Sequence, residues 1–309
     1  MRVVFLGTPE FALPSLNRLH RSHDVLLVVT RPSRPAGRRQ ALTAPPLFDE
    51  AGRLGLECIQ PPDVNSPEAL ERIGADSPDA VVAVAFGQLI RRPLLRLAPK
   101  GVLNLHPSLL PRHRGASPIQ TAILSGDDET GVTIMEMDRG LDTGPIFSRR
   151  ATPIRPDETA PELERRLAEL GADLLVETLD SIALGRLRAE PQDDSLATMT
   201  ARRGRSDGEI DWNEPAAKVH RMWRALHPWP GIHTVAGGRI LKILECGVAR
   251  NADCRGPAGH PKYAGGKLLL ATGDGCIEVT RLQPEGRKAM SARDFNLGYA
   301  ALMNANWGR

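Results

Sequence analysis

The stretch Ala80 to Gly87, which reads AVVAVAFG, carries an apolar side chain at every position up to Phe86. A strand that is apolar on both faces is typical of the centre of a parallel sheet covered by helices on both sides. Similar runs occur at Val3 to Gly7 and Val25 to Thr30, and the apolar residues between these two runs recur at helical spacing. Strand, helix and strand in this order predict a βαβ unit, around which a parallel sheet is built.

Further strand and helix patterns alternate through the first 184 residues. Strands are predicted at Cys58 to Gln60, Val102 to Leu105, Val132 to Met137 and Pro145 to Arg149, and helices at Pro45 to Leu54, Pro67 to Ile73 and Thr159 to about Leu184. This alternation predicts an α/β fold with a Rossmann-like, doubly wound, mostly parallel sheet. Ligands on such sheets bind outside the carboxyl ends of the strands.

The pattern changes after residue 184. Residues 185–209 are rich in Arg, Asp, Ser and Gly without an apolar period, which is typical of a linker. A short helix near His220 to Leu226 is followed by strands with glycine turns, at Ile232 to Ala236, Ile240 to Cys246, Lys267 to Ala271 and Cys276 to Leu282. We therefore predict a first domain over residues 1–184, a linker over 185–209 and a small C-terminal antiparallel β-barrel over 210–309.

Length and composition are those of an ordinary globular protein. A chain of 309 residues exceeds the size of most single cores, which favours two domains. No apolar run is long enough for a membrane span and the start does not resemble a signal peptide, so we expect a cytoplasmic protein. The histidines lack metal-ligand spacing and the cysteines are scattered, so we expect no metal, no disulfide framework and four reduced thiols, at Cys58, Cys246, Cys254 and Cys276.

Positive charge is concentrated in the second part of the chain. Residues 1–182 carry 21 Lys and Arg against 24 Asp and Glu, and residues 183–309 carry 19 against 13, which gives net charges of −3 and +6. A basic tail attracts polyanions such as nucleic acid, but a basic surface that only keeps the protein in solution explains the same numbers. Stacking on nucleic-acid bases is one role open to three tryptophans, Trp223, Trp229 and Trp307, although core packing is the commoner role of this residue type.

Asn104 and His106 are the first candidates for a functional site. They are two residues apart in a predicted strand, so both side chains point to the same side, and Pro107 tends to end the strand there. Asp142 lies in the turn Gly140 to Gly144 (GLDTG), between two predicted strands. Each feature alone has a structural explanation, a packed histidine or an aspartate that caps its own turn. Their combination favours a ligand site at the carboxyl end of the sheet.

Together with the run SLLP and with Arg114-Gly115, these three residues resemble the formyltransferases that use 10-formyltetrahydrofolate. The spacing Asn-x-His before Ser-Leu-Leu-Pro, with a Leu-Asp-Thr-Gly loop after a strand, is much harder to meet by chance than any single element. The resemblance implies a catalytic trio and a folate-binding run, consisting of Asn104, His106 and Asp142 for the trio and of Ser108, Leu109, Leu110 and Pro111 for the run. Folate is then a co-substrate, and no metal takes part.

Within that superfamily the sequence is most similar to the methionyl-tRNA formyltransferase family, over nearly the whole chain. The motifs that carry the similarity are Phe5 to Phe11, Arg34 to Arg38, Ala116 to Gln120, Gly131 to Met135, Ile210 to Trp212 and His227 to Gly231. That family joins a Rossmann-like catalytic domain to a barrel of the oligonucleotide-binding (OB) type. The resemblance implies formylation of initiator methionyl-tRNA for translation initiation, and we expect the protein to act as a monomer.

The resemblance also assigns a partner to the loop Arg31 to Gln40. The corresponding loop of the family enters the acceptor stem of the tRNA, which implies that Arg38 and its neighbour Arg39 bind RNA. The sequence departs from the family after Arg38, where Arg39-Gln40-Ala41 replaces what is often a glycine followed by lysines. Without the resemblance, so short a cluster of arginines indicates a solvated surface loop.

Each residue of the trio suits one need of formyl transfer, in which an amine attacks a formyl carbon. The amide of Asn104 can donate a hydrogen bond to the developing oxyanion, and loss of one such donor commonly costs about 3 kcal/mol of barrier. The imidazole of His106 can take or relay the proton that the amine loses, and Asp142 can orient and stabilise the imidazolium. No covalent intermediate is needed.

Three other functions remain as alternatives. A folate-dependent formyltransferase acting on a sugar-nucleotide amine would show the same trio, and only the basic loop and basic C-terminal region favour tRNA. A dehydrogenase is disfavoured, because Gly7-Thr8-Pro9 lacks the Gly-x-Gly-x-x-Gly fingerprint. A non-catalytic RNA-binding protein is disfavoured because all three residues of the trio are present.

Overall fold

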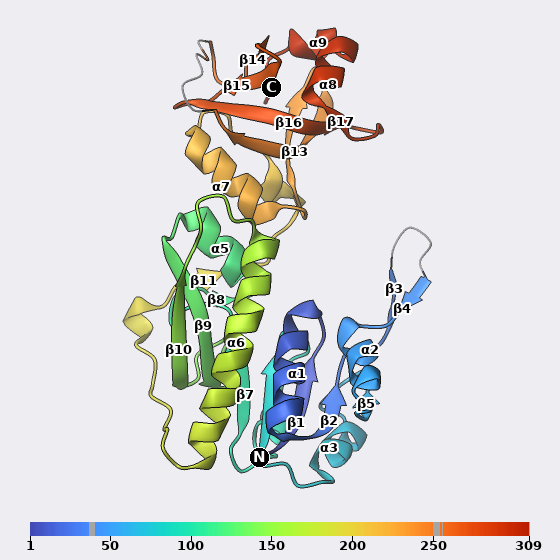
Figure 1. Cartoon of the computed structure of the whole chain (residues 1–309), viewed down its shortest axis with the longest axis vertical. Helices are drawn as coiled ribbons and strands as arrows, with labels where there is room; N and C mark the ends of the chain where they lie inside the picture. The colour runs from blue at the N-terminus through green and yellow to red at the C-terminus, as the bar shows by residue number, and fades with distance from the viewer. Residues whose placement is uncertain (37–40, 250–253, 255, 309) are drawn as a thin grey trace. The chain divides into compact units, whose positions relative to one another are not determined.

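A computed structural model describes residues 1–36, 41–249, 254 and 256–308 (Figure 1). By their contacts the residues form two compact units. The N-terminal unit comprises Met1–Pro118, Glu129–Pro153 and Leu163–Thr200, and the C-terminal unit comprises Ile119–Asp128, Ile154–Glu162 and Ala201–Arg309. The predicted domain limits at residues 184 and 209 stay predictions, and the contacts group Leu163–Thr200, which extends past residue 184, with the N-terminal unit.

The N-terminal unit is built on a seven-stranded sheet with the strand order β10-β9-β7-β6-β1-β2-β5. The strands are β1 (Arg2–Gly7), β2 (Asp24–Val29), β5 (Cys58–Ile59), β6 (Ala80–Val84), β7 (Val102–His106), β9 (Glu129–Glu136) and β10 (Ile146–Pro153). Strands β5, β2, β1, β6 and β7 are parallel, and β9 pairs antiparallel with both β7 and β10. The predicted Rossmann-like, mostly parallel sheet is confirmed.

The direction of strand addition reverses at β1. The chain passes from β1 to β2 and β5 on one side, and then crosses to β6 and β7 on the other side. Ligands of open α/β sheets bind at such a reversal, outside the carboxyl ends of the strands. The relevant ends here are those of β1 and β6, and the end of β7 is adjacent to them.

Helices cover this sheet along its length (Figure 1). They are α1 (Leu13–Ser22), α2 (Pro46–Arg53), α3 (Pro67–Gly74), α4 (Arg92–Leu95) and the long α6 (Ala160–Ala183). The side chains of β6 are at most 3% exposed, as its apolar sequence predicts. Gly171 allows α6 to approach β7 closely, since a Cβ there would lie 2.5 Å from Cδ1 of Leu105. Among the described residues, no helix is long and apolar enough to cross a bilayer.

The C-terminal unit contains an antiparallel sheet with the order β12-β13-β16-β15-β14, and β17 pairs with β16. Its elements are α5 (Pro118–Ser125), α7 (Ala216–Leu226), β12 (Ile232–Ala236), β13 (Arg239–Val248), β14 (Pro261–Ala264), β15 (Lys267–Ala271), β16 (Cys276–Pro284), β17 (Met290–Ser291), α8 (Ala292–Gly298) and α9 (Ala300–Met303). Trp307 is the centre of its core, in edge contact with Trp212 and Phe295. The antiparallel strands are confirmed, while within the described residues no pairing of β12 with β14 closes them into a barrel.

One disulfide corrects the expectation of four reduced thiols. Cys254 is bonded to Cys276 at the start of β16, across a separation of 22 residues. No sequence motif marks this pair, because Cys254 lies outside the strands and only the fold brings it to Cys276. Cys58 and Cys246 are free thiols, and burial raises the pKa of Cys58 to about 11 and that of Cys246 to about 12.

Candidate active site

Asn104 and His106 lie at the carboxyl end of β7, on the same side of the strand. Asn104 is half-buried, and among the described residues its side-chain amide has no hydrogen-bond partner. His106 is 4% exposed. The amide is therefore available to a ligand at the sheet edge, while the imidazole is held inside the protein.

The hydrogen bond of the His106 ring defines which ring nitrogen can take up a proton. Its Nε2 lies 3.0 Å from the main-chain oxygen of His113. A carbonyl oxygen only accepts, so Nε2 carries the hydrogen and Nδ1 of the neutral ring has a free lone pair. Nδ1 lies 3.7 Å from Oδ2 of Asp142. Burial lowers the pKa of His106, and the Asp142 carboxylate opposes this effect.

Asp142 is held by the backbone of its turn and by Gly115. Its φ of +55° is in the left-handed region, which is uncommon for a residue other than glycine. The amide of Gly115 donates to its Oδ2 at 2.8 Å. Within the turn, the side chain of Asp138 accepts from the amide of Gly140 at 2.9 Å and from the hydroxyl of Thr143 at 2.8 Å. The carboxylate that faces His106 is therefore fixed in direction before any ligand binds.

A polar network that the sequence analysis did not predict supports this turn. The side-chain amide of Gln192 donates to the main-chain oxygens of Asp142 at 2.8 Å and Gly144 at 2.7 Å. Its oxygen accepts from Arg114 at 2.8 Å, and Arg114 also binds Asp194 at 2.8 Å. Gln192 lies in the segment predicted as a linker, and no motif in that segment distinguishes it.

Gly115 is required at its position by a close approach of two short strands. Strand β8 (Arg114–Gly115) pairs in parallel with β11 (Met199–Thr200). Gly115 has a φ of +108°, and a Cβ there would lie 2.6 Å from the main-chain oxygen of Thr200. The donor to Asp142 is therefore a residue whose conformation and surroundings both demand glycine.

The predicted folate-binding run Ser108 to Pro111 forms the turn after β7. Ser108 is fully buried and its hydroxyl donates to the main-chain oxygen of Arg112 at 2.6 Å. The hydroxyl of Thr133 donates to the oxygen of Ser108 at 2.6 Å and accepts from the amide of Leu110 at 3.2 Å. Leu110 is also fully buried, whereas Leu109 is half-buried. Contact of this run with folate stays a prediction. The main chain and the side chain of Leu109 are the parts best suited to make such a contact.

The loop after β6 is a second feature that the sequence analysis did not include in the site. Ala85 and Gly87 have φ values of +47° and +79°, and the hydroxyl of Thr8 donates to the main-chain oxygen of Phe86 at 2.8 Å. Leu89 is 72% exposed. Left-handed backbone directly after a central strand, at the reversal of strand order, is frequent at ligand sites. The Phe86-Gly87 pair at the end of the apolar run was the available signal.

Arg38 and Arg39, the predicted tRNA-binding residues, lie outside the described residues. The chain on either side of them forms a hairpin, in which β3 (Arg34–Ala36) pairs antiparallel with β4 (Ala41–Thr43). Arg34 is exposed, and with Arg31 and Arg91 it lines a cavity of about 430 Å³. Groups of His, Cys, Asp or Glu that could hold a metal ion are absent from the part of the chain that the structure describes.

The fold and this site are those of a formyl transferase. The formyl transferase family model matches residues 1–179, and the model of the formyl transferase C-terminal domain matches residues 204–300. The methionyl-tRNA formyltransferase of Trichlorobacter lovleyi is 44% identical over 301 residues, which cover 96% of this chain and 94% of that protein. That of Solibacter usitatus is 44% identical and covers 100% of this chain and 99% of its own length. The chain belongs to the methionyl-tRNA formyltransferase family.

Solved structures share the fold at much lower identity. An N-formyltransferase from Helicobacter canadensis, in complex with folinic acid and dTDP-3-aminofucose, has a TM-score of 0.66 at 18% identity and covers 90% of this chain and 98% of its own. The sugar 3N-formyl transferase WlaRD has a TM-score of 0.67 at 17% identity, with 93% and 99% covered. At this identity the likeness concerns the architecture, not the acceptor.

Proposed function

We propose that the protein transfers the formyl group of 10-formyltetrahydrofolate to the α-amino group of methionyl-initiator tRNA, giving N-formylmethionyl-tRNA. The observation that carries the proposal is the alignment of Nδ1 of His106 with Asp142, beside the side-chain amide of Asn104, which has no hydrogen-bond partner in the described part of the chain. Relatives at 44% identity along the full chain support the choice of tRNA over a sugar nucleotide as acceptor. We also propose a monomer that acts in the cytoplasm.

The trio meets the needs of the reaction in order. The acceptor nitrogen forms a bond to the formyl carbon, the bond from that carbon to the donor nitrogen breaks, and one proton moves from acceptor to donor. The Asn104 amide donates to the formyl oxygen as charge develops there, a contribution of about 3 kcal/mol. Nδ1 of His106 takes the acceptor proton, and the resulting imidazolium faces Asp142 at 3.7 Å. The proton then passes to the departing nitrogen.

The α-amine of an aminoacyl ester needs little activation. It is less basic than an alkyl amine, so a large part is neutral near pH 7 and can attack directly. His106 then has only to accept a proton from the more acidic nitrogen that forms on attack, which a ring of lowered pKa can do. The enzyme therefore does not need the strongly basic group that deprotonation of a lysine-like amine would require.

Folate is assigned to the edge between the carboxyl ends of β6 and β7. This position places a formyl donor beside Asn104, and it is adjacent to the reversal of strand order. The exposed side chain of Leu89 and the half-buried Leu109 offer apolar contacts on either side. The turn Ser108 to Pro111 would contribute its main chain rather than the buried side chains of Ser108 and Leu110.

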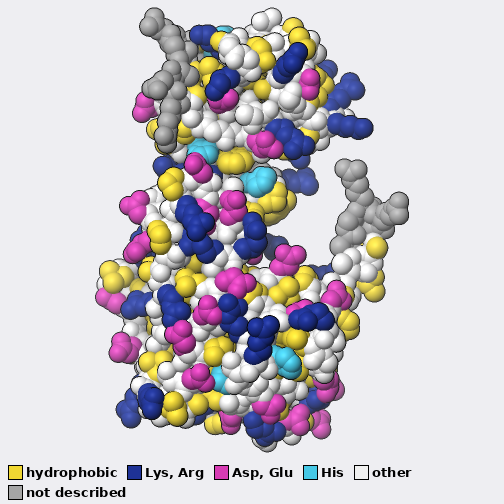
Figure 2. All heavy atoms as spheres, in the orientation of Figure 1, with side chains coloured by type: hydrophobic (Ala, Val, Ile, Leu, Met, Phe, Trp, Pro, Cys, Tyr) yellow, Lys and Arg dark blue, Asp and Glu magenta, His cyan; other side chains and the backbone are white. Residues whose placement is uncertain are grey.

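Binding of tRNA is assigned to Arg38 and Arg39 and to the basic C-terminal region. In sequence the two arginines come between β3 and β4, and residues 183–309 have a net charge of +6. Lys and Arg side chains gather along the right-hand edge of the C-terminal unit in Figure 2. Phosphate binding by several such cations gives an affinity that falls steeply with salt. This division of roles leaves the trio to the chemistry and the basic surfaces to acceptor binding.

One competition assay tests the proposal. The protein is incubated with 10-formyltetrahydrofolate and two acceptors at once, initiator tRNA charged with methionine and an amino sugar nucleotide. We expect formylmethionyl-tRNA as the product, with turnover abolished by His106→Ala and with no product from uncharged tRNA. Formylation of the sugar nucleotide in preference to the tRNA would reject the proposed acceptor, and no product from either would reject the proposed reaction.

A further inference from the structure

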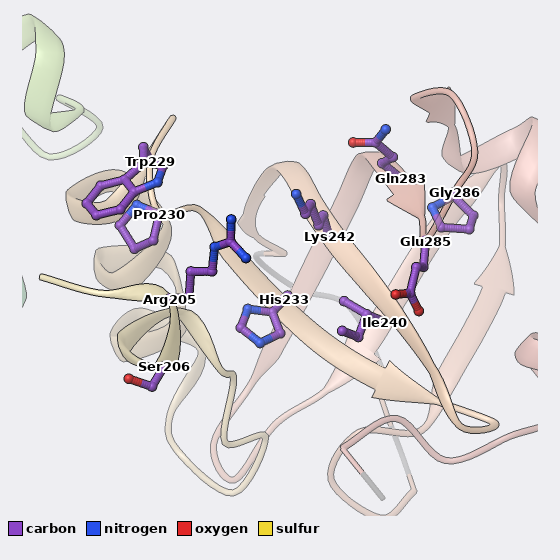
Figure 3. Close-up of a pocket in the computed structure, with 11 residues that line it drawn as sticks. Arg205, Ser206, Trp229, Pro230, His233, Ile240, Lys242, Gln283, Glu285 and Gly286 are labelled. Atoms are coloured by element: carbon purple, nitrogen blue, oxygen red, sulfur yellow. The ribbon is translucent and has the colours of Figure 1, made fainter. Parts of the chain in front are cut away.

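An open pocket of about 540 Å³ lies wholly within the C-terminal unit (Figure 3). Its floor is the outer face of the sheet formed by β12, β13 and the end of β16. Its sides come from Trp229 and Pro230, from Arg205 at the start of η3 (Arg205–Gly208), and from the turn at Glu285 and Gly286. Its volume is within the range of small-ligand sites, roughly 300–1,000 Å³.

The floor is a row of polar side chains set by strand register. His233 on β12 is paired with Lys242 on β13, and Lys242 is paired with Gln283 on β16. Residues paired in this way project from the same face of a sheet. Their chain neighbours, such as Thr234 and Leu241, are buried on the other face. The polar row is therefore the solvent side of the sheet and is open to a ligand.

Trp229 lies at one side of this pocket (Figure 3). It is 61% exposed, whereas Trp212 and Trp307 are at most 3% exposed and Trp223 is half-buried. The expectation that core packing accounts for the tryptophans is wrong for Trp229. An exposed tryptophan ring keeps a large apolar area in contact with water. A partner that covers this area lowers the free energy of the complex.

The charged groups of the pocket favour an anion. Arg205 and Lys242 are exposed, and neither forms an ion pair with any described carboxylate. Other lysines of the same unit do, for example Lys267, which lies 2.8 Å from Glu278. The pocket lining contains one carboxylate, Glu285. Two cations without an ion-pair partner among the described residues thus line the pocket together with an aromatic ring, Arg205 on the side of Trp229 and Lys242 on the floor (Figure 3).

We propose that this pocket binds one unpaired nucleotide of the RNA substrate, a role that rests on the proposed function. Its base would stack on Trp229 and its phosphates would contact Arg205 and Lys242. Aromatic rings beside cations are how proteins hold single-stranded nucleic acid, since every base has a π face. Glu285 can accept a hydrogen bond from an amino group on the edge of the base. Acidic groups alone would use the cations but not the aromatic ring, whereas a nucleotide uses both.

Trp229 provides a direct readout, because it is the most accessible of the four tryptophans. Intrinsic fluorescence and its quenching by acrylamide are measured for the full-length protein and for Trp229→Phe, and the difference isolates the Trp229 signal. Titrants are uncharged initiator tRNA, a short single-stranded oligoribonucleotide and heparin. We expect tRNA and the oligoribonucleotide to protect Trp229 from acrylamide and heparin to leave it accessible. Equal protection by heparin would overturn the proposal in favour of a general polyanion surface.

Affinity measurements on variants complete the test. We expect Trp229→Ala to raise the Kd for tRNA about tenfold, Trp229→Phe to retain most of the affinity through its smaller ring, and Lys242→Ala to weaken binding and flatten its salt dependence. Lys267→Ala removes the same charge from the same unit outside the pocket, where Glu278 already pairs with it, and should raise Kd less than Lys242→Ala does. Thermal unfolding midpoints check that each variant is folded. A Kd for Trp229→Ala equal to that of the wild type would overturn the proposal.

The two proposals can fail separately. If the wild-type protein formylates methionyl-tRNA while Trp229 stays accessible in the tRNA complex, the pocket assignment is wrong and the enzymatic one stands. If the protein forms no formylmethionyl-tRNA but the single-stranded oligoribonucleotide still protects Trp229, the pocket binds RNA and the acceptor assignment is wrong.

Discussion

The side-chain amide of Gln192 donates a 2.8 Å hydrogen bond to the main-chain oxygen of Asp142, 50 residues earlier in the chain. Through this bond, an uncharged residue that hydrogen-bonds the main chain and not the carboxylate of Asp142 fixes the turn that directs this carboxylate at His106. Arg114 in turn fixes Gln192 from the other side. The site therefore depends on a second layer of polar groups, each with its partner.

Substitution of Gln192 should damage turnover more than substrate binding. Gln192→Ala removes both donors to the Asp142 turn, and we expect kcat to fall roughly ten- to hundredfold with little change in the KM for either substrate. Gln192→Glu should be worse, because it places a carboxylate oxygen opposite two carbonyl oxygens. Steady-state kinetics measure both variants. A larger change in KM than in kcat would show that Gln192 does not act through the trio.

Replacement of the trio's acid and base should abolish turnover. His106→Ala removes the proton acceptor and Asp142→Asn removes the charge that stabilises the imidazolium, so we expect each to lower kcat by about 100-fold or more at saturating donor. The amide oxygen introduced by Asp142→Asn could still accept the hydrogen bond from Gly115, so the turn should keep its shape. Near-normal kcat in either variant would remove the assignment. Circular dichroism and tRNA binding serve as controls for folding.

The buried imidazole of His106 should make stability depend on pH. Burial lowers its pKa in the folded protein below the unfolded value near 6.5. Between these two values the unfolded chain binds the extra proton, so the free energy of unfolding should fall as the pH drops below about 6.5. The pKa values of the half-buried His23 and His220 shift in the same direction.

Urea unfolding at pH 7.5 and pH 5.5 checks this dependence. We expect His106→Gln to lose less stability over that interval than the wild type, since one proton-linked group is gone. His20→Gln, at an exposed position of α1, should change nothing. An identical pH dependence of His106→Gln and wild type would contradict the shift. In the wild type, kcat should fall less between pH 7.5 and pH 6.5 than it would with a histidine of ordinary pKa, because burial lowers the pKa of His106.

Gly115→Ala should destabilise the protein through a steric clash, in addition to the cost of placing alanine at a positive φ. The added Cβ would lie 2.6 Å from the oxygen of Thr200, at a φ of +108°. We expect a loss of about 3 kcal/mol in the free energy of unfolding. Gly185→Ala is the matched control, because its φ is +65° and its Cβ would meet nothing within 4 Å. A loss of about 1 kcal/mol is expected there. Equal losses would rule out the clash.

Arg38→Ala should weaken tRNA binding with a specific salt signature. If Arg38 contacts a phosphate, its removal lowers the slope of log Kd against log salt by about one. Arg21→Ala is a suitable control, since Arg21 is exposed. It lies just before the amino end of β2, whereas the loop that carries Arg38 follows the carboxyl end of the same strand. Fluorescence anisotropy of labelled tRNA over several salt concentrations gives the slopes. An unchanged slope for Arg38→Ala would argue against RNA contact there.

The sequence predicted the features that depend on local patterns. The apolar run Ala80 to Gly87 became the central strand β6, and the two-residue spacing of Asn104 and His106 placed both on one side of β7. The GLDTG turn also brought Asp142 to His106, which the resemblance implied and the structure places at 3.7 Å. These features follow from periodicity and turn chemistry, which short stretches of sequence contain.

The features that were missed depend on contacts between distant segments. Gln192 and Thr200 lie in a polar stretch without period, and only the fold brings them to Arg114 and Gly115. The Cys254–Cys276 bond and the exposure of Trp229 were missed for the same reason, since residue type alone does not determine which surface a side chain faces. Strand β9 was predicted as a strand, but its own residues do not indicate that it pairs antiparallel with β7 and β10.

The pairing of β8 with β11 has a practical consequence for anyone who isolates the catalytic half. A fragment ending at Leu184 would retain every strand of the large sheet and all three reacting side chains, yet it would lack Gln192, Asp194 and Thr200. Such a fragment could look native by its secondary structure and still be inactive. Truncation should therefore leave residues 185–200 in place, since this polar stretch holds the active-site turn in position and is not a dispensable linker.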